Sequence, residues 1–219
     1  MRINACTKTV QGKTILRCPS LTLSPGLIYA VIGANGSGKS TFARLVSGVL
    51  PADGGTRVLE GAEVVRYMPQ KSCVFRMSTR NNVLLAGGDA TRAEALMDAL
   101  RLNALAKRRA SVLSGGETAK MALARVLTQP CELLILDEPT AAMDMESAAV
   151  SERLILDYSK ETGCAVLLIT HDLHQARRLA DQALFFHNGD LLESGPAERV
   201  LVQPENAETK KFLKFYGGT

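Results

Sequence analysis

The sequence predicts an α/β protein with a mainly parallel central sheet, an antiparallel β lobe and an inserted helical lobe. Three nearly continuous apolar runs have the composition of parallel strands buried on both faces, and they occupy residues 27–32, 133–136 and 165–170. Short strand-like runs separated by turns fill residues 2–23 and predict the antiparallel lobe. Helical spacing follows, so we expect residues 71–130 to form a helical lobe inserted in a single domain of residues 1–219.

The N-terminal strands are predicted from strand-forming residues and the turns between them. They are expected at residues 2–10, 14–23, 57–59 and 64–68. Turn residues such as Gln11-Gly12 and Glu60-Gly61 separate these runs.

Helices are predicted where apolar residues recur every three or four positions. They are expected at residues 41–49, 91–105, 118–129, 145–161 and 205–216. Gly163 stops the fourth of these helices. Asn188 and Gly189 predict a tight hairpin between strands at residues 183–187 and 191–193.

Composition restricts the class of protein. The 219 residues can bury one sizeable core, and 46% hydrophobic with 22% charged residues is an ordinary globular balance. No apolar run approaches the ~20 residues of a membrane-spanning helix. Residues 1–8 also lack the apolar core of a secretory signal. The net charge of +4 suits an anionic ligand or a membrane-adjacent partner, without requiring nucleic acid.

Cysteine usage predicts a reducing compartment. The cysteines are Cys6, Cys18, Cys73, Cys131 and Cys164. They are odd in number, widely spaced and without a Cys-x-x-Cys pair, so neither a zinc site nor a disulfide framework is expected.

A glycine-rich loop follows the first apolar strand and opens a helix. It reads Gly33, Ala34, Asn35, Gly36, Ser37, Gly38, Lys39 and Ser40, with Thr41 next, and it matches the phosphate-binding pattern G-x-x-x-x-G-K-[ST]. Glycines let backbone N–H groups approach an anion, and the helix N-terminus adds positive potential. Lys39 can contact the β- and γ-phosphates of a nucleotide, and the Ser40 hydroxyl can ligate Mg²⁺. An ordinary glycine-rich turn is the alternative interpretation.

Two carboxylates end the second apolar strand. In phosphate-loop NTPases an acid in the position of Asp137 holds Mg²⁺. Glu138 comes directly after it, at a strand end where α/β ligand crevices lie, and can activate the attacking water. The alternative is a pair of solvated acids that cap a buried strand.

A second potential anion site lies at residues 113–117. Ser114, Gly115, Gly116 and Glu117 precede a predicted helix, so their backbone N–H groups can bind an anion. A capped helix start, with Ser114 or Thr118 as the cap, is the alternative. One chain with one nucleotide does not need two such sites. Two chains placed head to tail would pair them, with each ATP between one chain's loop and the other chain's Ser-Gly-Gly turn.

The motifs in this order resemble the nucleotide-binding subunits of ABC (ATP-binding cassette) transporters over roughly residues 2–200. Residues 33–41 look like Walker A, 67–70 like the Q-loop, 113–117 like the signature, 133–140 like Walker B, 141–144 like the D-loop and 170–172 like the H-switch. The tail between Gly195 and Leu213 is similar to the ends of bacterial importer subunits.

This resemblance implies a role for each matched residue. Glu138 would be the catalytic base, and His171 would reach the γ-phosphate. Gln70 would contact Mg²⁺ and sense the membrane partner. Asp144 would act across a dimer, on the nucleotide of the partner chain.

The sequence departs from the family pattern at several positions. Val10 stands where the family usually has an aromatic residue that stacks on adenine, so base selectivity is open. Glu117 replaces the usual glutamine, and Ala119-Lys120 replaces the usual Gln-Arg. His171 also has two alternative interpretations. It could be a structural residue, or it could bind a metal ion together with His174, although no third or fourth ligand for such a site is evident.

The function implied by the resemblance is ATP hydrolysis that powers a membrane importer from the cytoplasmic face. The permease would be a separate polypeptide, served by an extracytoplasmic solute-binding protein. The solute would be an oxyanion such as tungstate or phosphate, or a polar amino acid. Two alternatives stay open, namely a soluble ABC ATPase that acts on macromolecules and a regulatory nucleotide-binding module without turnover.

Overall fold

A mixed eight-stranded sheet organises the fold. This computed structural model describes residues 1–55, 58–85 and 87–217. The sheet has the order β2-β3-β11-β10-β5-β9-β8-β7. Its strands are β2 (Cys6–Val10), β3 (Lys13–Cys18), β11 (Asp190–Pro196), β10 (Gln182–His187), β5 (Ile28–Ile32), β9 (Ala165–Ile169), β8 (Leu133–Asp137) and β7 (Val65–Met68). The strands from β10 to β7 run parallel, whereas β2–β3 and β10–β11 pair antiparallel, which confirms the α/β class.

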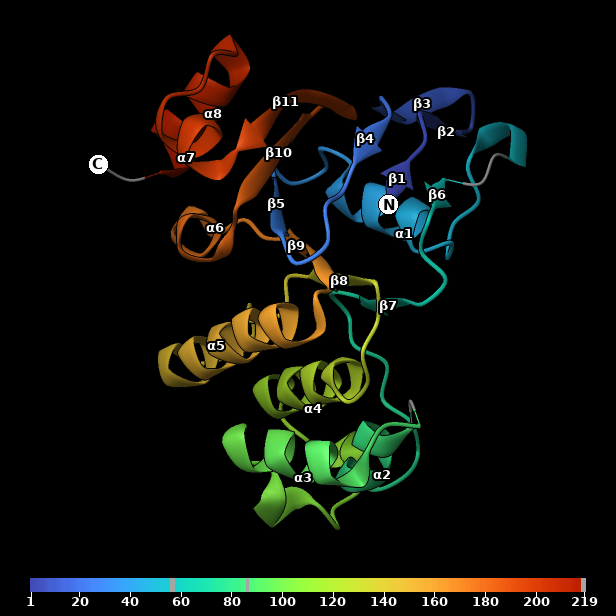
Figure 1. Cartoon of the computed structure of the whole chain (residues 1–219), viewed down its shortest axis with the longest axis vertical. Coiled ribbons are helices and arrows are strands. Elements are labelled where there is room, and N and C mark those ends of the chain that lie inside the picture. Colours follow the sequence, from blue (N-terminus) through green and yellow to red (C-terminus); the bar gives the residue numbers. More distant parts are fainter. Residues whose placement is uncertain (56–57, 86, 218–219) are drawn as a thin grey trace.

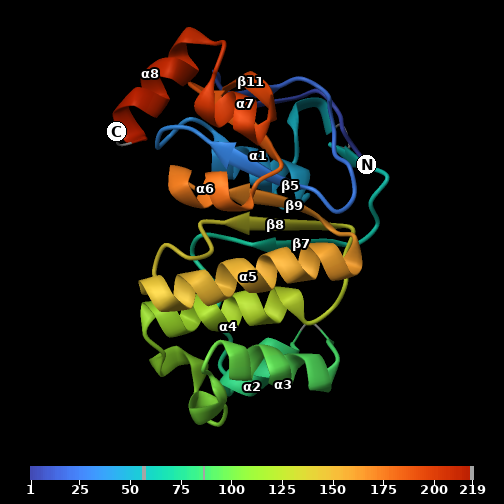
Figure 2. The same ribbon diagram turned by 60° about the vertical axis from the view of Figure 1, so that its left-hand side comes forward.

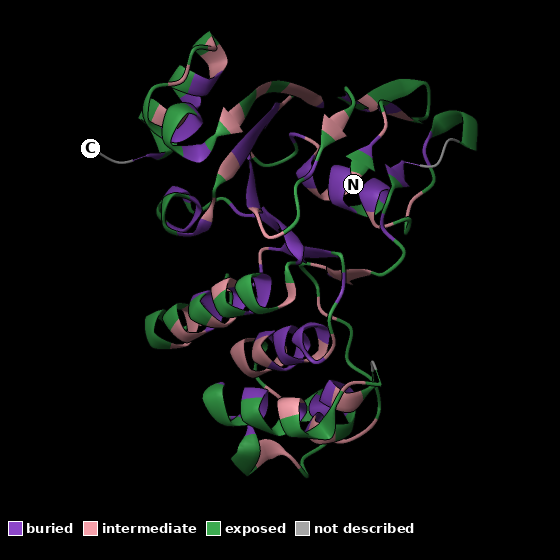
Figure 3. Ribbon diagram, viewed as in Figure 1, coloured by how far each residue is buried: buried purple, intermediate pink, exposed green. Residues whose placement is uncertain are grey.

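The central strands are the apolar runs of the sequence. Every residue of β5, β8 and β9 is buried, as Figure 3 shows in the middle of the molecule. Strands covered on both faces can be apolar throughout, because neither face meets water. The prediction from these three runs is therefore confirmed, and so is the β10–β11 hairpin that turns at Asn188 and Gly189.

The N-terminal strands are shorter than predicted. A small antiparallel sheet of order β4-β1-β6 consists of β4 (Leu21–Thr22), β1 (Arg2–Ile3) and β6 (Leu59–Glu60). The predicted strand 2–10 breaks at Asn4, whose backbone N–H donates to Val58 O at 2.7 Å, so β1 and β2 enter different sheets. The predicted strand 14–23 breaks at Pro19, which has no N–H to donate to a ladder.

The strand predicted at 57–59 also differs from expectation, whereas the strand predicted at 64–68 is confirmed as β7. Arg57 lies outside the described residues, and the strand there is Leu59–Glu60, which includes the predicted turn residue Glu60. The strand β7 does not pair with β6. It forms the edge of the parallel sheet, with Met68 opposite Leu136 of β8.

The helices cover both faces of the sheet and form one end of the molecule. They are α1 (Lys39–Val46), α2 (Thr79–Leu84), α3 (Ala90–Ala99), α4 (Gly115–Leu127), α5 (Met145–Thr162), α6 (Leu173–Leu179), α7 (Ala197–Val202) and α8 (Ala207–Tyr216). Single turns of 3₁₀ helix occur at η1 (Asp53–Gly55), η2 (Asn103–Leu105) and η3 (Ala110–Val112).

Several helix boundaries differ from the predicted ones. The helix predicted at 91–105 is α3 followed by η2, because Arg101 adopts a left-handed φ of 56° between them. The helix predicted at 118–129 begins earlier, since Ser114 caps it, and α1 ends before Gly48, whose φ is 75°. The prediction for α5 is confirmed, with Gly163 at a φ of 67° directly after it.

Alternate residues of the core strands pack into two different layers, one on each face of the sheet. Leu133 and Ile135 of β8 pack in the cluster that includes α1, whereas Leu134 and Leu136 pack in the cluster that includes α4 and α5. In Figures 1 and 2, α4 and α5 lie between the sheet and α2 and α3, while α7 and α8 lie at the opposite end. Between β7 and β8 the chain thus forms α2, α3 and α4.

Candidate active site

The phosphate-binding loop lies between β5 and α1, where the backbone requires glycine. Gly33 has a φ of 146°, and a Cβ there would lie 2.1 Å from Phe186 O. Gly38 has a φ of 103° and caps α1. A side chain at either position would strain the backbone or collide with β10 or β3, so the loop places its N–H groups on the inside of the turn.

Lys39 lies within this loop rather than on the surface. Its Nζ donates to Gly33 O at 2.7 Å and to Ala34 O at 2.9 Å, and the residue is 7% exposed. Burial lowers the pKa of Lys39, while the charges of Glu138 and Asp137 act in the opposite direction. The ammonium group is thus held next to two carboxylates and the loop, where it can meet an anionic ligand.

Asp137 ends β8 beside the loop and is 1% exposed. Its Oδ2 accepts a hydrogen bond from the Tyr67 hydroxyl at 3.4 Å, and its Oδ1 has no partner among the described residues. A buried carboxylate oxygen without a donor is costly unless a cation meets it. Ser37 Oγ is a second buried polar atom without a partner within the described part of the chain. These two atoms fit a site that receives a phosphate and its metal ion.

Glu138 and His171 meet directly, although they come from different strands. Nδ1 of His171 lies 2.7 Å from Oε2 of Glu138. The backbone N–H of Glu138 donates to Ile169 O at 2.9 Å, which links the ends of β8 and β9. The side chain of Glu138 is 9% exposed and that of His171 is 63% exposed. The pair is therefore buried at the carboxylate and open to solvent at the imidazole.

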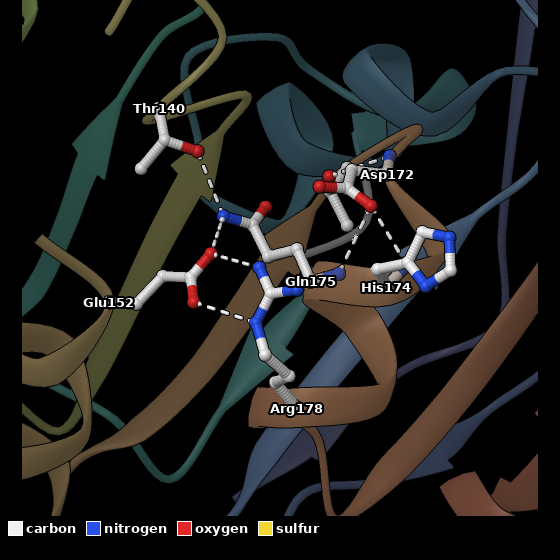
Figure 4. A network of polar contacts seen from close by, with 7 residues as sticks. Thr140, Glu152, Asp172, His174, Gln175 and Arg178 are labelled. Atoms are coloured by element: carbon white, nitrogen blue, oxygen red, sulfur yellow. Dashed lines mark hydrogen bonds and ion pairs between the residues drawn. The ribbon is translucent and has the colours of Figure 1, made fainter. Parts of the chain in front are cut away.

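A cavity of about 520 Å³ adjoins this pair, and a polar network forms one wall of it. Gln175 donates through Nε2 to Thr140 Oγ1 at 2.8 Å and to Glu152 Oε1 at 3.1 Å. Arg178 donates through Nη2 and Nε to the two Glu152 oxygens at 2.7 and 3.0 Å. Figure 4 shows these residues and the Asp172 carboxylate that caps α6.

This network was missed from the sequence. Gln175 and Arg178 lie three positions apart on α6, whereas Glu152 lies on α5. No sequence spacing therefore connects Glu152 to the two residues of α6. The signal in the sequence was limited to polar residues on helices next to the His171 segment. The contacts tie the segment that follows Glu138 to the helix that follows His171.

Ser114 and Asp144 act as helix caps within their own chain. The Ser114 hydroxyl accepts from Glu117 N at 3.3 Å, and Glu117 Oε2 accepts from Ser114 N at 2.7 Å. These bonds lower the pKa of Glu117. Asp144 accepts from Ser147 N at 2.8 Å. The capped-helix interpretation is thus correct for Ser114, and it leaves the N–H groups of Gly115 and Gly116 at the helix start. Asp144 caps α5 in the same way.

The Ser-Gly-Gly turn and the phosphate loop belong to helices on opposite faces of the sheet. Helix α1 packs with Leu133 and Ile135, whereas α4 packs with Leu134 and Leu136. A Cβ on Gly116 would lie 2.9 Å from Ala142 O, so the turn packs closely on the segment before Asp144. The structure therefore brings the turn next to residues 141–144, on the face of the sheet away from α1.

Gln70 and Val10 lie at the margins of the site. Gln70 is exposed and follows the end of β7, at the same sheet edge as Asp137. Val10 is 46% exposed at the end of β2 and pairs with Lys13 across the hairpin. Residues 1–55, 58–85 and 87–217 contain no helix long and apolar enough to cross a membrane. Within the same ranges, no three histidine, cysteine or acidic residues cluster to hold a metal ion.

The comparisons with known proteins agree on one family. The ABC transporter family model matches residues 16–141. The phosphate import ATP-binding protein PstB 2 of Natronomonas pharaonis is 34% identical, over 92% of this chain and 82% of its own length. The tungstate uptake system ATP-binding protein TupC of Peptoclostridium acidaminophilum is 35% identical, over 85% of this chain and 94% of its own length. The zinc import ATP-binding protein ZnuC of Yersinia pestis is 35% identical, over 93% of this chain and 81% of its own length.

The solved structures show the same fold. The ATP-binding subunit of an ABC transporter superposes with a TM-score of 0.84 at 19% identity, covering 99% of both chains. A nucleotide-free ATP-binding cassette gives a TM-score of 0.80 at 20% identity. The chain therefore belongs to the ABC transporter family, as one of its ATP-binding subunits of importer type.

Proposed function

We propose that this chain hydrolyses ATP and thereby drives import through a separate membrane permease at the cytoplasmic face. The observation that carries the catalytic part is the 2.7 Å contact between His171 Nδ1 and Glu138 Oε2 beside the phosphate loop. A carboxylate that is buried, held by a histidine and located at the carboxyl edge of a parallel sheet suits a general base.

Three residues have distinct catalytic roles in this proposal. Glu138 accepts a proton from the water that attacks the γ-phosphate, and His171 positions that carboxylate and faces the same phosphate. Lys39 turns its ammonium from Gly33 O and Ala34 O toward the β- and γ-phosphates. The loop backbone from Gly33 to Ser40 and the first turn of α1, including Thr41, hold the phosphates through N–H groups.

The metal ligands proposed for Mg²⁺ are Ser40, Gln70 and Asp137. The unpartnered Asp137 Oδ1 and the hydroxyl and amide oxygens of the other two are hard donors of the kind that Mg²⁺ prefers. When bound, the ion neutralises charge on the phosphate oxygens. Asp137 keeps one oxygen on Tyr67 and leaves the other free for this purpose.

We propose a head-to-tail homodimer that closes around two ATP molecules. The residues offered to the partner chain's nucleotide are Ser114, Gly115, Gly116 and Glu117, with Asp144 beside them. Their position on the sheet face opposite α1 supports this arrangement, because one chain cannot easily bring both helix N-termini to one phosphate. Val10 contributes an aliphatic contact to the base.

We propose that residues 71–88 contact the permease. Val74 is 37% and Phe75 is 42% exposed, and Lys71, Arg76 and Arg80 are basic residues of the same segment. For the solute we propose an oxyanion, delivered by an extracytoplasmic solute-binding protein. The similarity to one relative named for phosphate and one named for tungstate supports that class.

The test of the catalytic proposal is ATP turnover by the purified chain and by Glu138→Gln. Wild-type protein should hydrolyse ATP only with Mg²⁺, and Glu138→Gln should lower the rate by about 10²–10⁴-fold while ATP still binds. Unchanged turnover in the variant would reject Glu138 as the base. For the solute, uptake of labelled phosphate or tungstate by cells with the assembled transporter should need intact Glu138.

A further inference from the structure

Two buried cysteines contact each other at the edge of the sheet opposite the nucleotide site. Cys131 precedes β8 and Cys164 directly precedes β9, and their Sγ atoms lie 3.5 Å apart. They are 7% and 1% exposed. Because β8 and β9 are hydrogen-bonded neighbours, the sheet itself holds the two sulfurs together. A small movement of the side chains would bring them to bonding distance.

A phenol and a guanidinium lie near Cys131 in addition to Cys164. Tyr158 Oη lies 3.2 Å from Sγ of Cys131 and donates its own proton to Gln129 O at 2.8 Å, so the Cys131 S–H donates to the phenol oxygen. The guanidinium of Arg66 acts on Cys131 from β7, and its Nε is buried without a hydrogen-bond partner among the described residues. The hydrogen bond with Cys164 lowers the pKa of Cys131 most; burial opposes this, and Tyr158 and Arg66 lower it further. A low pKa beside a cation is the usual condition of a reactive cysteine.

Cys164 has the opposite environment. Its S–H donates to Ala165 O at 3.2 Å, and its hydrogen bond with Cys131, together with burial, raises its pKa. Glu132 adds a smaller effect in the same direction. The pair therefore consists of one thiol whose pKa is lowered and one thiol whose pKa is raised. This is the asymmetry of an attacking and a resolving cysteine.

We propose that Cys131 and Cys164 form a peroxide-oxidisable dithiol that closes to a reversible disulfide. The Cys131 thiolate attacks one oxygen of hydrogen peroxide, so an S–O bond forms, the O–O bond breaks and the departing hydroxide takes a proton to become water. The Cys164 sulfur then attacks the sulfenic sulfur, so the S–S bond forms and the S–O bond breaks. The hydroxide leaves with the proton of Cys164 as a second water. The two sulfurs are oxidised by two electrons, and the peroxide is reduced.

The test is disulfide mapping in the full-length protein with Cys73→Ser, which removes the exposed thiol. After hydrogen peroxide treatment, digestion without reductant should give a peptide pair that joins Cys131 to Cys164, and dithiothreitol should reverse it. The same linkage should form at least about tenfold more slowly in the urea-unfolded chain, because only the fold holds the sulfurs together.

Three further variants separate the roles of the sulfurs and of Arg66. In Cys164→Ser the sulfenic acid should persist on Cys131 and react with dimedone, whereas Cys164 in Cys131→Ser should stay unlabelled. Arg66→Gln should slow the labelling of Cys131 by about threefold to tenfold, the range of a pKa shift of up to one unit. ATP binding by each variant checks that it is folded.

Three results would overturn the proposal. They are absence of the 131–164 linkage in the folded wild-type pair, equal rates in folded and unfolded protein, and preferential labelling of Cys164. The Cys6–Cys18 pair, whose residues lie opposite each other on β2 and β3, serves as an internal reference for buried thiols elsewhere in the sheet.

Discussion

Glu138 has a left-handed backbone, with a φ of 54°. This conformation is unfavourable for a side chain with a Cβ, and it persists only where neighbouring contacts enforce it. Here the Glu138 N–H bonds to Ile169 O and the carboxylate meets His171. At this turn the carboxylate contacts His171, and its charge acts to raise the pKa of Lys39 in the loop. Backbone strain at one residue thus accompanies the placement of the proposed base.

In the proposed function, Val10 contacts the base of the nucleotide. Replacing it with an aromatic residue, Val10→Tyr, should tighten ATP binding by about twofold to tenfold, because stacking contributes about 0.5–1.5 kcal/mol. Equilibrium binding of a fluorescent ATP analogue, with GTP as competitor, measures this. Val10→Leu is the matched control, which adds volume without a ring and should leave affinity nearly unchanged. Equal affinity in all three proteins would mean that another side chain already covers the base.

At the scale of elements, polar contacts between helices hold the site in place. Helix α5 supplies Glu152, which is 9% exposed, and α6 supplies Gln175 and Arg178. The network lies between the segment after Glu138 and the segment after His171, so the two residues proposed to act in catalysis share one support. The support depends on helix packing, not on the motifs themselves.

Removing Glu152 should destabilise the fold. Glu152→Ala leaves the buried Gln175 amide with one fewer acceptor and Arg178 without its carboxylate, and we expect a loss of about 1–3 kcal/mol in the free energy of unfolding. Urea denaturation measures it. Glu161→Ala is the control, because its bond to Arg92 lies at the surface and should change stability by less than about 1 kcal/mol. Equal losses of unfolding free energy in the two variants would show that the network stabilises the fold no more than a surface ion pair does.

The loop after Gln70 is shaped by Asn82 and Arg125. Asn82 is fully buried, and its amide donates to the backbone carbonyls of Phe75 and Ser78 at 3.1 Å each. Arg125 donates to Cys73 O at 2.9 Å and stacks over the Phe75 ring, 5.2 Å from its centroid. Since Arg125 belongs to α4, the helix that begins at Ser114 also holds the surface proposed for the permease.

A cysteine at Phe75 or Met77 should crosslink to the permease. In Cys73→Ser protein co-expressed with the permease, Phe75→Cys should react with cysteines placed in cytoplasmic loops of the membrane subunit. The readout is a shifted band on a non-reducing gel. Glu208→Cys on α8, at the opposite end of the molecule in Figure 1, is the control and should not crosslink. Crosslinks only from α8 or the β lobe would reverse the proposed orientation.

At the scale of the whole molecule, the two proposed anion sites lie on opposite faces of one sheet, and this placement is the basis of the proposed second copy. The phosphate loop begins α1 and the Ser-Gly-Gly turn begins α4, and the sheet separates them. In a head-to-tail pair each ATP touches both kinds of site, so the γ-phosphates connect the two chains. Hydrolysis would then weaken that connection.

ATP should therefore control dimerisation of Glu138→Gln. The variant keeps the shape of the carboxylate but removes the base, so we expect a monomer without nucleotide and a dimer with Mg-ATP by light scattering. Adding Ser114→Arg should abolish the dimer and leave ATP binding intact, because Ser114 acts on the partner chain's nucleotide. The control is Ser114→Ala, which should weaken the helix cap without blocking the interface.

Two outcomes would contradict this arrangement. One is a dimer that forms equally well without ATP, and the other is loss of ATP binding by the Ser114→Arg chain itself. If Glu138→Gln stays monomeric at high concentration, the same measurement on the assembled transporter decides whether the permease must align the two chains. A transporter that traps no ATP in this variant rejects the mechanism.

The α/β class, the core strands and the motif residues could be predicted from local sequence. A strand buried on both faces must be apolar throughout, so β5, β8 and β9 are visible as continuous runs. The loop from Gly33 to Ser40 is equally visible, since only glycine tolerates its backbone at Gly33 and Gly38. In each case the reason lies within a few consecutive residues.

Only the tertiary structure decided which distant residues meet. The break at Asn4 sends β1 and β2 to different sheets because of a hydrogen bond to Val58, more than fifty positions away. The Glu138–His171 contact, the Glu152 network and the Cys131–Cys164 pair each join residues from separate elements. Such contacts depend on the order of strands in the sheet and on helix packing. These features are long-range, and no local pattern of residue types encodes them.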